Sequence, residues 1–169
     1  MFIIDPKPNR EMQIMLRAVK MKWGEVPPHW KLYAGINPAR FKMFMEEINY
    51  LSGHTRIDPN LFSFLRYVTA CMHGFGYCER FNHAYLLSRG YTSEQLDAVA
   101  ASREALPMDA RHGMLFVAAL DAMEDPAGLT AGVLETLYRA DWSDADIFDV
   151  LDHAAFLFKF HKILEAYLA

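Results

Sequence analysis

The amino-acid sequence predicts an all-α protein, an antiparallel bundle of helices. Three observations lead to this fold class. Apolar residues recur at helical spacing along nearly the whole chain, glycine and proline mark short joints between the apolar stretches, and no convincing strand is found. Because short joints make consecutive helices antiparallel neighbours, we expect a bundle.

The first half of the chain is expected to hold five helices, two of which open with the same signal. Residues 10–23 form the first helix, which Gly24 ends, and Val26-Pro27-Pro28 starts a short second one. Asn37-Pro38 and Asp58-Pro59 each place a capping residue before a proline at the first helical position. The third, fourth and fifth helices then reach Leu51, Cys71 and Ser88.

Four further helices are expected in the second half, again from their caps and breaks. Thr92-Ser93-Glu94-Gln95 is a capping box for a short helix, and Pro107 opens the next, which Asp125-Pro126 breaks. Residues 130–140 form another helix. Ser143-Asp144-Ala145-Asp146 caps the last one, which runs to about Leu168.

The composition bounds the class of protein. A chain of 169 residues fits one domain, residues 1–169. Hydrophobic residues make up 53% of the chain and aromatic residues 14%, a surplus that would suit a buried subunit interface. The net charge of −4 gives no broad basic field, so we expect no nucleic-acid partner. Two cysteines are too few for a disulfide framework, which favours a cytoplasmic location.

Neither a signal peptide nor a membrane span is expected. The apolar start Met1 to Ile4 is short and is ended by Asp5 and Pro6, and charged residues interrupt the last helix. The sequence therefore predicts a soluble protein without a membrane partner.

The stretch CMHGFGYCERFNH, residues 71–83, carries the candidate chemistry. Gly74 and Gly76 interrupt the helical pattern, so the chain would reverse there and place Cys78 in the first turn of the next helix. A helix N-terminus lowers the pKa of a thiol, and His73 or His83 would do the same or relay a proton. Cys71 is read either as a small buried residue or as a resolving thiol.

A metal site is the competing interpretation. The two cysteines and two histidines of this stretch are suitable ligand types, but their spacing matches none of the usual zinc patterns. Glu79 and His83 at i,i+4 are more typical of a solvated salt-bridge pair. We expect no metal and no cofactor, and we expect His153 and His161 to be hydrogen-bonded at the edge of the core.

Three stretches of the sequence resemble the alkylhydroperoxidase D-like / carboxymuconolactone decarboxylase superfamily, in its peroxidase-related branch. They are the entry GEVPPHWKLYAGINPARFKMFM, the core over residues 58–99, and the end WSDADIFDVLDHAAFLFKFHKILEAYL. The resemblance implies an alkylhydroperoxidase D-like helical bundle. It also implies a homo-oligomer, a dimer, trimer or hexamer.

The resemblance also implies where an active site would lie. Active members carry a glutamate, a Cys-x-x-Cys pair and a histidine, which fall on Ser63, Phe75, Cys78 and Asn82. Only Cys78 matches, and His83 lies one residue beyond the histidine position, turned by about 100° around a helix. The site is therefore a degenerate form of the family's motif.

Two functions follow from these residues. The first is a divergent thiol-dependent, peroxidase-like oxidoreductase with Cys78 as nucleophile, assisted by His83, His73 and Cys71. The second is a non-redox or lyase-type member that binds a small hydrophobic or acidic molecule. Its pocket would be lined by aromatic and polar residues of the same joint, namely Phe75, Tyr77, Phe81 and Asn82.

Overall fold

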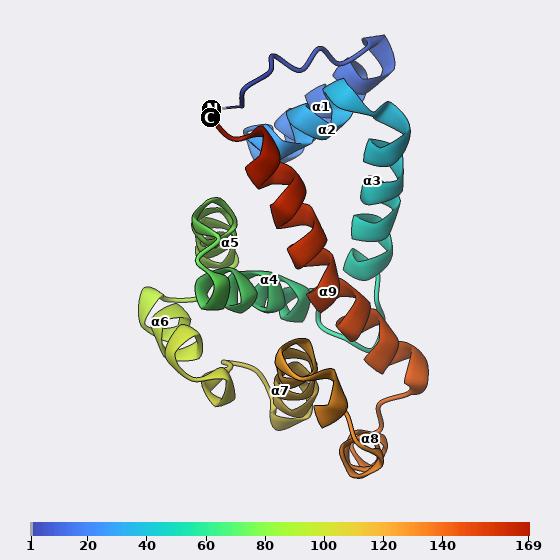
Figure 1. The fold of residues 1–169 in the computed structure, drawn as a ribbon, viewed down its shortest axis with the longest axis vertical. Coiled ribbons are helices and arrows are strands. Elements are labelled where there is room, and N and C mark those ends of the chain that lie inside the picture. The colour runs from blue at the N-terminus through green and yellow to red at the C-terminus, as the bar shows by residue number, and fades with distance from the viewer. Residues whose placement is uncertain (1) are drawn as a thin grey trace. The chain divides into compact units, whose positions relative to one another are not determined.

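The computed structural model describes residues 2–169, apart from the side chains of Lys22 and Trp23. Within this part of the chain no strand forms, and Phe2 and Leu168 make one isolated β-bridge. The predicted all-α class is confirmed (Figure 1). The elements are α1 (Arg10–Trp23), α2 (Pro28–Ile36), α3 (Pro38–Ser52), α4 (Pro59–His73), α5 (Gly76–Ser88), α6 (Ser93–Ala101), η1 (Arg103–Ala105), α7 (Ala110–Glu124), η2 (Pro126–Gly128), α8 (Ala131–Arg139) and α9 (Asp144–Tyr167).

Side-chain caps start the helices where the sequence predicts them. The Asn37 side chain accepts the N–H of Arg40 at 3.1 Å, and Asp58 caps α4 in the same way. Thr92 forms the predicted capping box at the start of α6. Ser143 Oγ accepts the N–H of Asp146 at 3.2 Å and so caps α9. These caps satisfy N–H groups that have no partner inside a helix.

The start predicted at Pro107 is wrong. The α7 helix begins at Ala110, because Asp109 supplies the cap by accepting the N–H of His112 at 2.9 Å. Pro107 does not start the helix, since the capping side chain of Asp109 lies two residues further on.

The chain divides into two compact units. Unit 1 comprises the residues up to Gly53 and those from Lys162 onward, and unit 2 comprises His54–His161. The boundary falls inside α9, which therefore contributes residues to both units. The single domain predicted for residues 1–169 stays a prediction.

Unit 1 contains α1, α2, α3 and the segment 2–8, which we call the strap. Its aromatic core centres on Trp30, whose ring meets the rings of Phe41 and Phe44 edge-on at 6.1 and 5.9 Å. The strap is tied to the end of α9, because the Ile3 N–H donates to the carbonyl of Tyr167 at 2.8 Å. Its residues therefore form a fixed part of unit 1.

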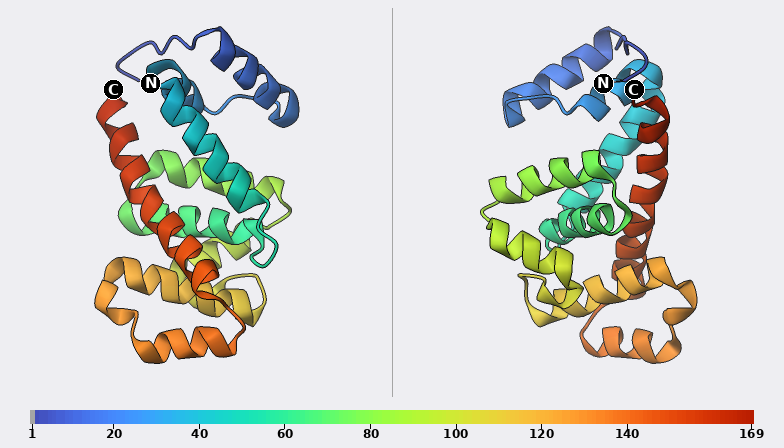
Figure 2. Two further views of the ribbon diagram at one scale, coloured as in Figure 1. Left: turned by 90° about the vertical axis from the view of Figure 1, so that its right-hand side faces the viewer. Right: turned by 60° about the vertical axis from the view of Figure 1, so that its left-hand side comes forward.

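Unit 2 is organised around α4. Both Leu61 and Phe64 are fully buried, and α4 contacts α5, α6 and α7. Figure 2 shows α7 and α8 as a helix pair connected by η2. Ser63 and Arg66 of α4 belong to the candidate site described below.

Among residues 2–169, no helix combines the length and apolar character that crossing a bilayer requires.

Candidate functional site

The joint between α4 and α5 reverses the chain as the sequence predicts. Gly74 ends α4 with a left-handed φ of 68°, a conformation that glycine adopts without strain, and α5 packs against α4. Cys71 lies on α4, and Cys78 is the third residue of α5. Both cysteines are free thiols.

Cys78 lies at a helix N-terminus, yet its environment disfavours the thiolate. Its side chain is 3% exposed. Burial raises the pKa of the Cys78 thiol to about 11, and the positive charge of Arg66 offsets only part of this effect. This is opposite to the lowered pKa that the sequence predicts, because desolvation outweighs the helix dipole at a buried site.

The two histidines expected to serve Cys78 contact aromatic rings instead. His73 stacks on Phe75 with ring centroids 5.5 Å apart, and the His83 ring lies 5.8 Å from the ring of Tyr67. Neither imidazole forms a hydrogen bond with Cys78 within the part of the chain that the structure describes. The proposed relay to Cys78 is therefore not assembled.

Cys71 is half-buried and is also poorly suited to ionisation. Burial raises the pKa of its thiol, and a hydrogen bond from Tyr67 lowers it without reversing the shift. The negative charges of Glu79 and Asp97 raise it further. Both thiols are thus protonated at neutral pH, and neither is an activated nucleophile.

A polar cluster centred on Arg66 lies next to Cys78 and joins three helices. Arg66 of α4 donates from Nε to Asn82 Oδ1 of α5 at 3.0 Å. It donates from Nη2 to Ser63 Oγ at 2.8 Å, and its Nη1 lies 2.7 Å from His153 Nε2 of α9. We call Ser63, Arg66, Asn82 and His153 the Arg66 cluster.

The Arg66 cluster fixes the protonation of its histidine. A guanidinium only donates hydrogen bonds, so His153 Nε2 must accept, and the imidazole is the neutral tautomer protonated on Nδ1. Asn82 in turn donates from Nδ2 to the carbonyl of Cys78 at 2.8 Å, which sets its amide orientation. The three partners of Arg66 named above are therefore uncharged.

The predicted pocket residues separate into two environments. Asn82 is buried in the Arg66 cluster, whereas Phe75 is stacked on His161 of α9, with ring centroids 3.4 Å apart. Tyr77 and Phe81 are half-buried. Their role in binding a ligand stays a prediction. His73 does line a cavity of about 310 Å³, together with residues of α4 and α6 and with Arg103 and Glu124.

Sequence reasoning missed Arg66 and treated His153 as a core-edge residue. The hydrogen bond of His153 agrees with that expectation, but its partner was not foreseen. One signal was available, because Arg66 is the only charged residue between Pro59 and Met72 in an otherwise apolar helix. A charge in such a helix needs buried polar partners, which marks it as a candidate site residue.

No group of three or more cysteine, histidine or acidic side chains gathers as a metal site among the residues that the structure describes.

Solved structures with a similar fold provide the comparison with known proteins. An uncharacterized peroxidase-related protein from Silicibacter sp. TM1040 matches with a TM-score of 0.83 and 21% identity, over 97% of this chain and 85% of that one. A second such protein, from Ralstonia eutropha JMP134 and described as an alkylhydroperoxidase AhpD core, has a TM-score of 0.80 and 17% identity, over 95% and 84% of the two chains.

A third match is a protein of unknown function from Agrobacterium tumefaciens, described as a candidate antioxidant defence protein of the AhpD type. Its TM-score is 0.63 at 20% identity, over 80% of this chain and 92% of that one. No protein-family model and no curated protein matches the sequence.

These matches show that the chain has the alkylhydroperoxidase D-like fold that its sequence predicts. Two residues of the Arg66 cluster fall on positions of the motif that the resemblance implies. Ser63 and Asn82 occupy the positions where the resemblance places a glutamate and a histidine, and both hydrogen-bond to Arg66. Two of the four positions of the degenerate motif are therefore bonded to the same guanidinium.

Proposed function

We propose that this chain is a non-redox, small-molecule-binding protein built on the alkylhydroperoxidase D-like fold. Its site is the Arg66 cluster, and its ligand is a small carboxylate. One observation supports the proposal: the Arg66 guanidinium is hydrogen-bonded to His153 and to Ser63 and Asn82, two positions where the resemblance implies catalytic residues.

The chemistry of Arg66 favours a carboxylate. A guanidinium is always charged and presents a planar fork of donors that matches the two oxygens of a carboxylate. The hydrogen bonds that Arg66 donates to Ser63, Asn82 and His153 hold the fork in one orientation, so little conformational entropy is lost on binding. Arg66 is only half-buried, which leaves part of the residue in contact with solvent.

The thiol environment supports the same choice. A peroxidase needs a thiolate at neutral pH, and burial raises the pKa of Cys78 to about 11. At pH 7 the thiolate would therefore be a very small fraction of Cys78. A binding site that uses Arg66 has no such requirement.

Calorimetric titration with a panel of small aliphatic and aromatic carboxylates tests the proposal. We expect Arg66→Lys, which keeps the charge but loses the planar fork, to weaken binding by about tenfold or more. Cys78→Ala is the matched control and should bind as the unmodified protein does. Unfolding curves of each variant separate lost binding from lost structure. If none of the carboxylates in the panel binds, the Arg66 cluster is not a carboxylate site.

A divergent thiol oxidoreductase is the second candidate function. It is favoured by the positive charge of Arg66, which lowers the pKa of Cys78 against the effect of burial. In this mechanism the Cys78 thiolate attacks a peroxide, and Cys71 or an external thiol reduces the resulting sulfenic acid. His83 or His73 would have to turn toward Cys78 to carry the proton, since their rings lie against Tyr67 and Phe75.

Thiol alkylation and peroxide consumption distinguish the two candidates. If Cys78 reacts with iodoacetamide at pH 7 faster than Cys71, and Cys78→Ser abolishes thiol-dependent peroxide consumption, the redox function is correct. If the half-buried Cys71 reacts first and peroxide consumption is absent, the binding function is favoured.

We also propose a cytoplasmic homo-oligomer, a dimer, trimer or hexamer. Large apolar side chains stay exposed in the single chain, with Met21 at 89%, Phe148 at 68% and Ile14 at 60%. Light scattering coupled to size exclusion would measure the mass. A monomer at micromolar concentration would contradict the proposal.

A further inference from the structure

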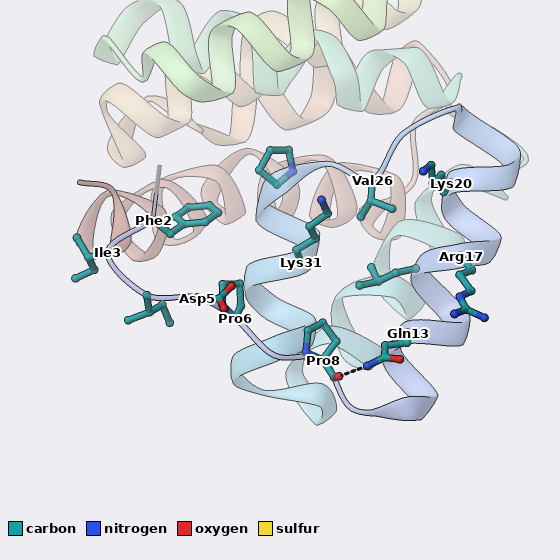
Figure 3. A pocket seen from close by; sticks show the side chains of 13 residues that line it. Phe2, Ile3, Asp5, Pro6, Pro8, Gln13, Arg17, Lys20, Val26 and Lys31 are labelled. Carbon is teal, nitrogen blue, oxygen red and sulfur yellow. Dashed lines mark hydrogen bonds between the residues drawn. The ribbon is translucent and has the colours of Figure 1, made fainter.

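A second candidate site lies in unit 1 and shares no residue with the Arg66 cluster. An open cavity of about 830 Å³ is lined by the strap, α1 and residues 26–31 at the start of α2. Figure 3 shows the strap along one side, Arg17 and Lys20 of α1 along the other, and Lys31 of α2 between them. Its volume is within the range of small-molecule sites, roughly 300–1,000 Å³.

The wall formed by the strap is held in place at three points. Ile3 hydrogen-bonds to Tyr167, and Gln13 Nε2 donates to the carbonyl of Pro8 at 2.9 Å. Between them the strap lies directly on Gly35, where an added Cβ would come within 2.6 Å of Pro6 Cβ. Such close backbone approach requires glycine, so this wall of the cavity is packed against α2.

The lining is amphipathic. Apolar side chains from all three elements, including Phe2, Leu16 and Val26, form much of the surface. Arg17, Lys20 and Lys31 stand among them, against one acid, Asp5.

The three cations are exposed and are available to a ligand. Within the residues that the structure describes, no side-chain hydrogen bond or ion pair engages Arg17, Lys20 or Lys31. The surplus of positive charge in the lining stands out in a chain whose net charge is −4. An apolar surface beside uncompensated cations complements a molecule with an alkyl body and an anionic head.

We propose that this cavity binds a long-chain carboxylate of the fatty-acid class. The alkyl chain lies against the strap, Leu16 and Val26, and the carboxylate pairs with Arg17, Lys20 or Lys31. A neutral apolar ligand would leave the cations unused, and a small hydrophilic anion would leave the apolar surface exposed.

Titration of the full chain with hexanoate, octanoate and decanoate tests the apolar part of the site. Affinity should rise with length, by up to about four-fold for each methylene that is fully buried. 1-Decanol, which has the same chain without the charge, should bind at least about tenfold more weakly than decanoate. Equal affinity for all three acids would overturn the proposal.

A pair of charge variants tests the polar part. Arg17→Gln with Lys31→Gln should weaken decanoate binding about tenfold or more. Arg10→Gln with Arg40→Gln is the matched control, because both residues are exposed, lie in the same unit and are outside the cavity. If both double variants weaken binding equally, only net charge matters and the site is wrong.

Three further measurements distinguish this cavity from the Arg66 cluster and from a membrane surface. Arg66→Lys should leave decanoate binding unchanged, so the proposals for the two units fail independently.

Gly35→Ala should displace the strap and weaken decanoate binding, whereas Gly113→Ala in α7 should not. Sedimentation with vesicles of phosphatidylserine tests a membrane surface as the ligand: binding to vesicles without binding to free decanoate would overturn the proposal.

Discussion

The cations of the two units are held in opposite ways. In unit 2, Arg66 is hydrogen-bonded to residues of three helices, and its partners Ser63, Asn82 and His153 are each at most 3% exposed. In unit 1, Arg17 and Lys31 stand exposed around an apolar cavity. A half-buried, hydrogen-bonded cation contributes to both stability and recognition, whereas an exposed cation contributes to recognition alone.

Arg66→Met should produce the largest loss of stability. The substitution leaves the acceptors on Ser63, Asn82 and His153 buried without their donor. Each buried acceptor that loses its donor costs roughly 1–3 kcal/mol, so the free energy of unfolding should fall by about 3 kcal/mol or more. Urea unfolding followed by circular dichroism measures it. A loss below about 1 kcal/mol would mean that water replaces the guanidinium.

The Cys78 thiol makes unit 2 sensitive to alkaline pH. Its pKa is raised from the ordinary value of 9.0 to about 11, so the unfolded chain ionises first as the pH rises. The contribution of the protonated thiol is therefore complete below pH 9 and is lost between about pH 9 and 11, by up to about 3 kcal/mol.

Urea unfolding of the unmodified protein and of Cys78→Ala at pH 7 and pH 11 measures this effect. Between pH 7 and pH 11, the free energy of unfolding should fall by more in the unmodified protein than in Cys78→Ala. Cys71→Ala removes a half-buried thiol whose pKa is also raised, and it should change the alkaline dependence in the same direction. If the free energy of unfolding falls equally in both proteins at alkaline pH, Cys78 is more hydrated than its burial indicates.

Two glycine substitutions compare the strap with an open helix surface. Gly35→Ala places a Cβ 2.6 Å from Pro6 Cβ and 2.8 Å from Lys7 N, and it should cost roughly 1–3 kcal/mol. Gly113→Ala lies within α7 with no atom within 4 Å of the new Cβ, and it should stabilise by about 0.5–1 kcal/mol. Thermal unfolding of both variants should show opposite shifts in Tm. Shifts of the same sign would contradict the packing at the strap.

The smallest effect is expected for the exposed cations of unit 1. Arg17→Gln with Lys31→Gln should change the free energy of unfolding by no more than about 0.5 kcal/mol for each substitution, since neither side chain forms a hydrogen bond among the described residues. The same urea assay used for Arg66→Met measures it. A large loss here would remove the distinction between the two kinds of cation.

The sequence predicts the helices well because their starts are local. Asn37, Asp58 and Ser143 cap the helices that follow them through bonds that span at most three residues. The start at Pro107 failed for an equally local reason, since Asp109 is the better cap.

The candidate site is less predictable because its decisive contacts are distant in the chain. Ser63 is three residues from Arg66, but Asn82 and His153 are 16 and 87 residues away. The helix N-terminus at Cys78 is visible in the sequence, whereas its burial depends on packing that periodicity does not reveal. The sequence therefore locates the joint correctly and assigns its thiol the wrong pKa shift.

The bridge between Phe2 and Leu168 brings two distant segments of the chain side by side. A short flexible linker would therefore join residue 169 to residue 2 without disturbing unit 1. New ends opened in the exposed turn at Gly128, between α7 and α8, would give a circular permutant with the same helices in a different order.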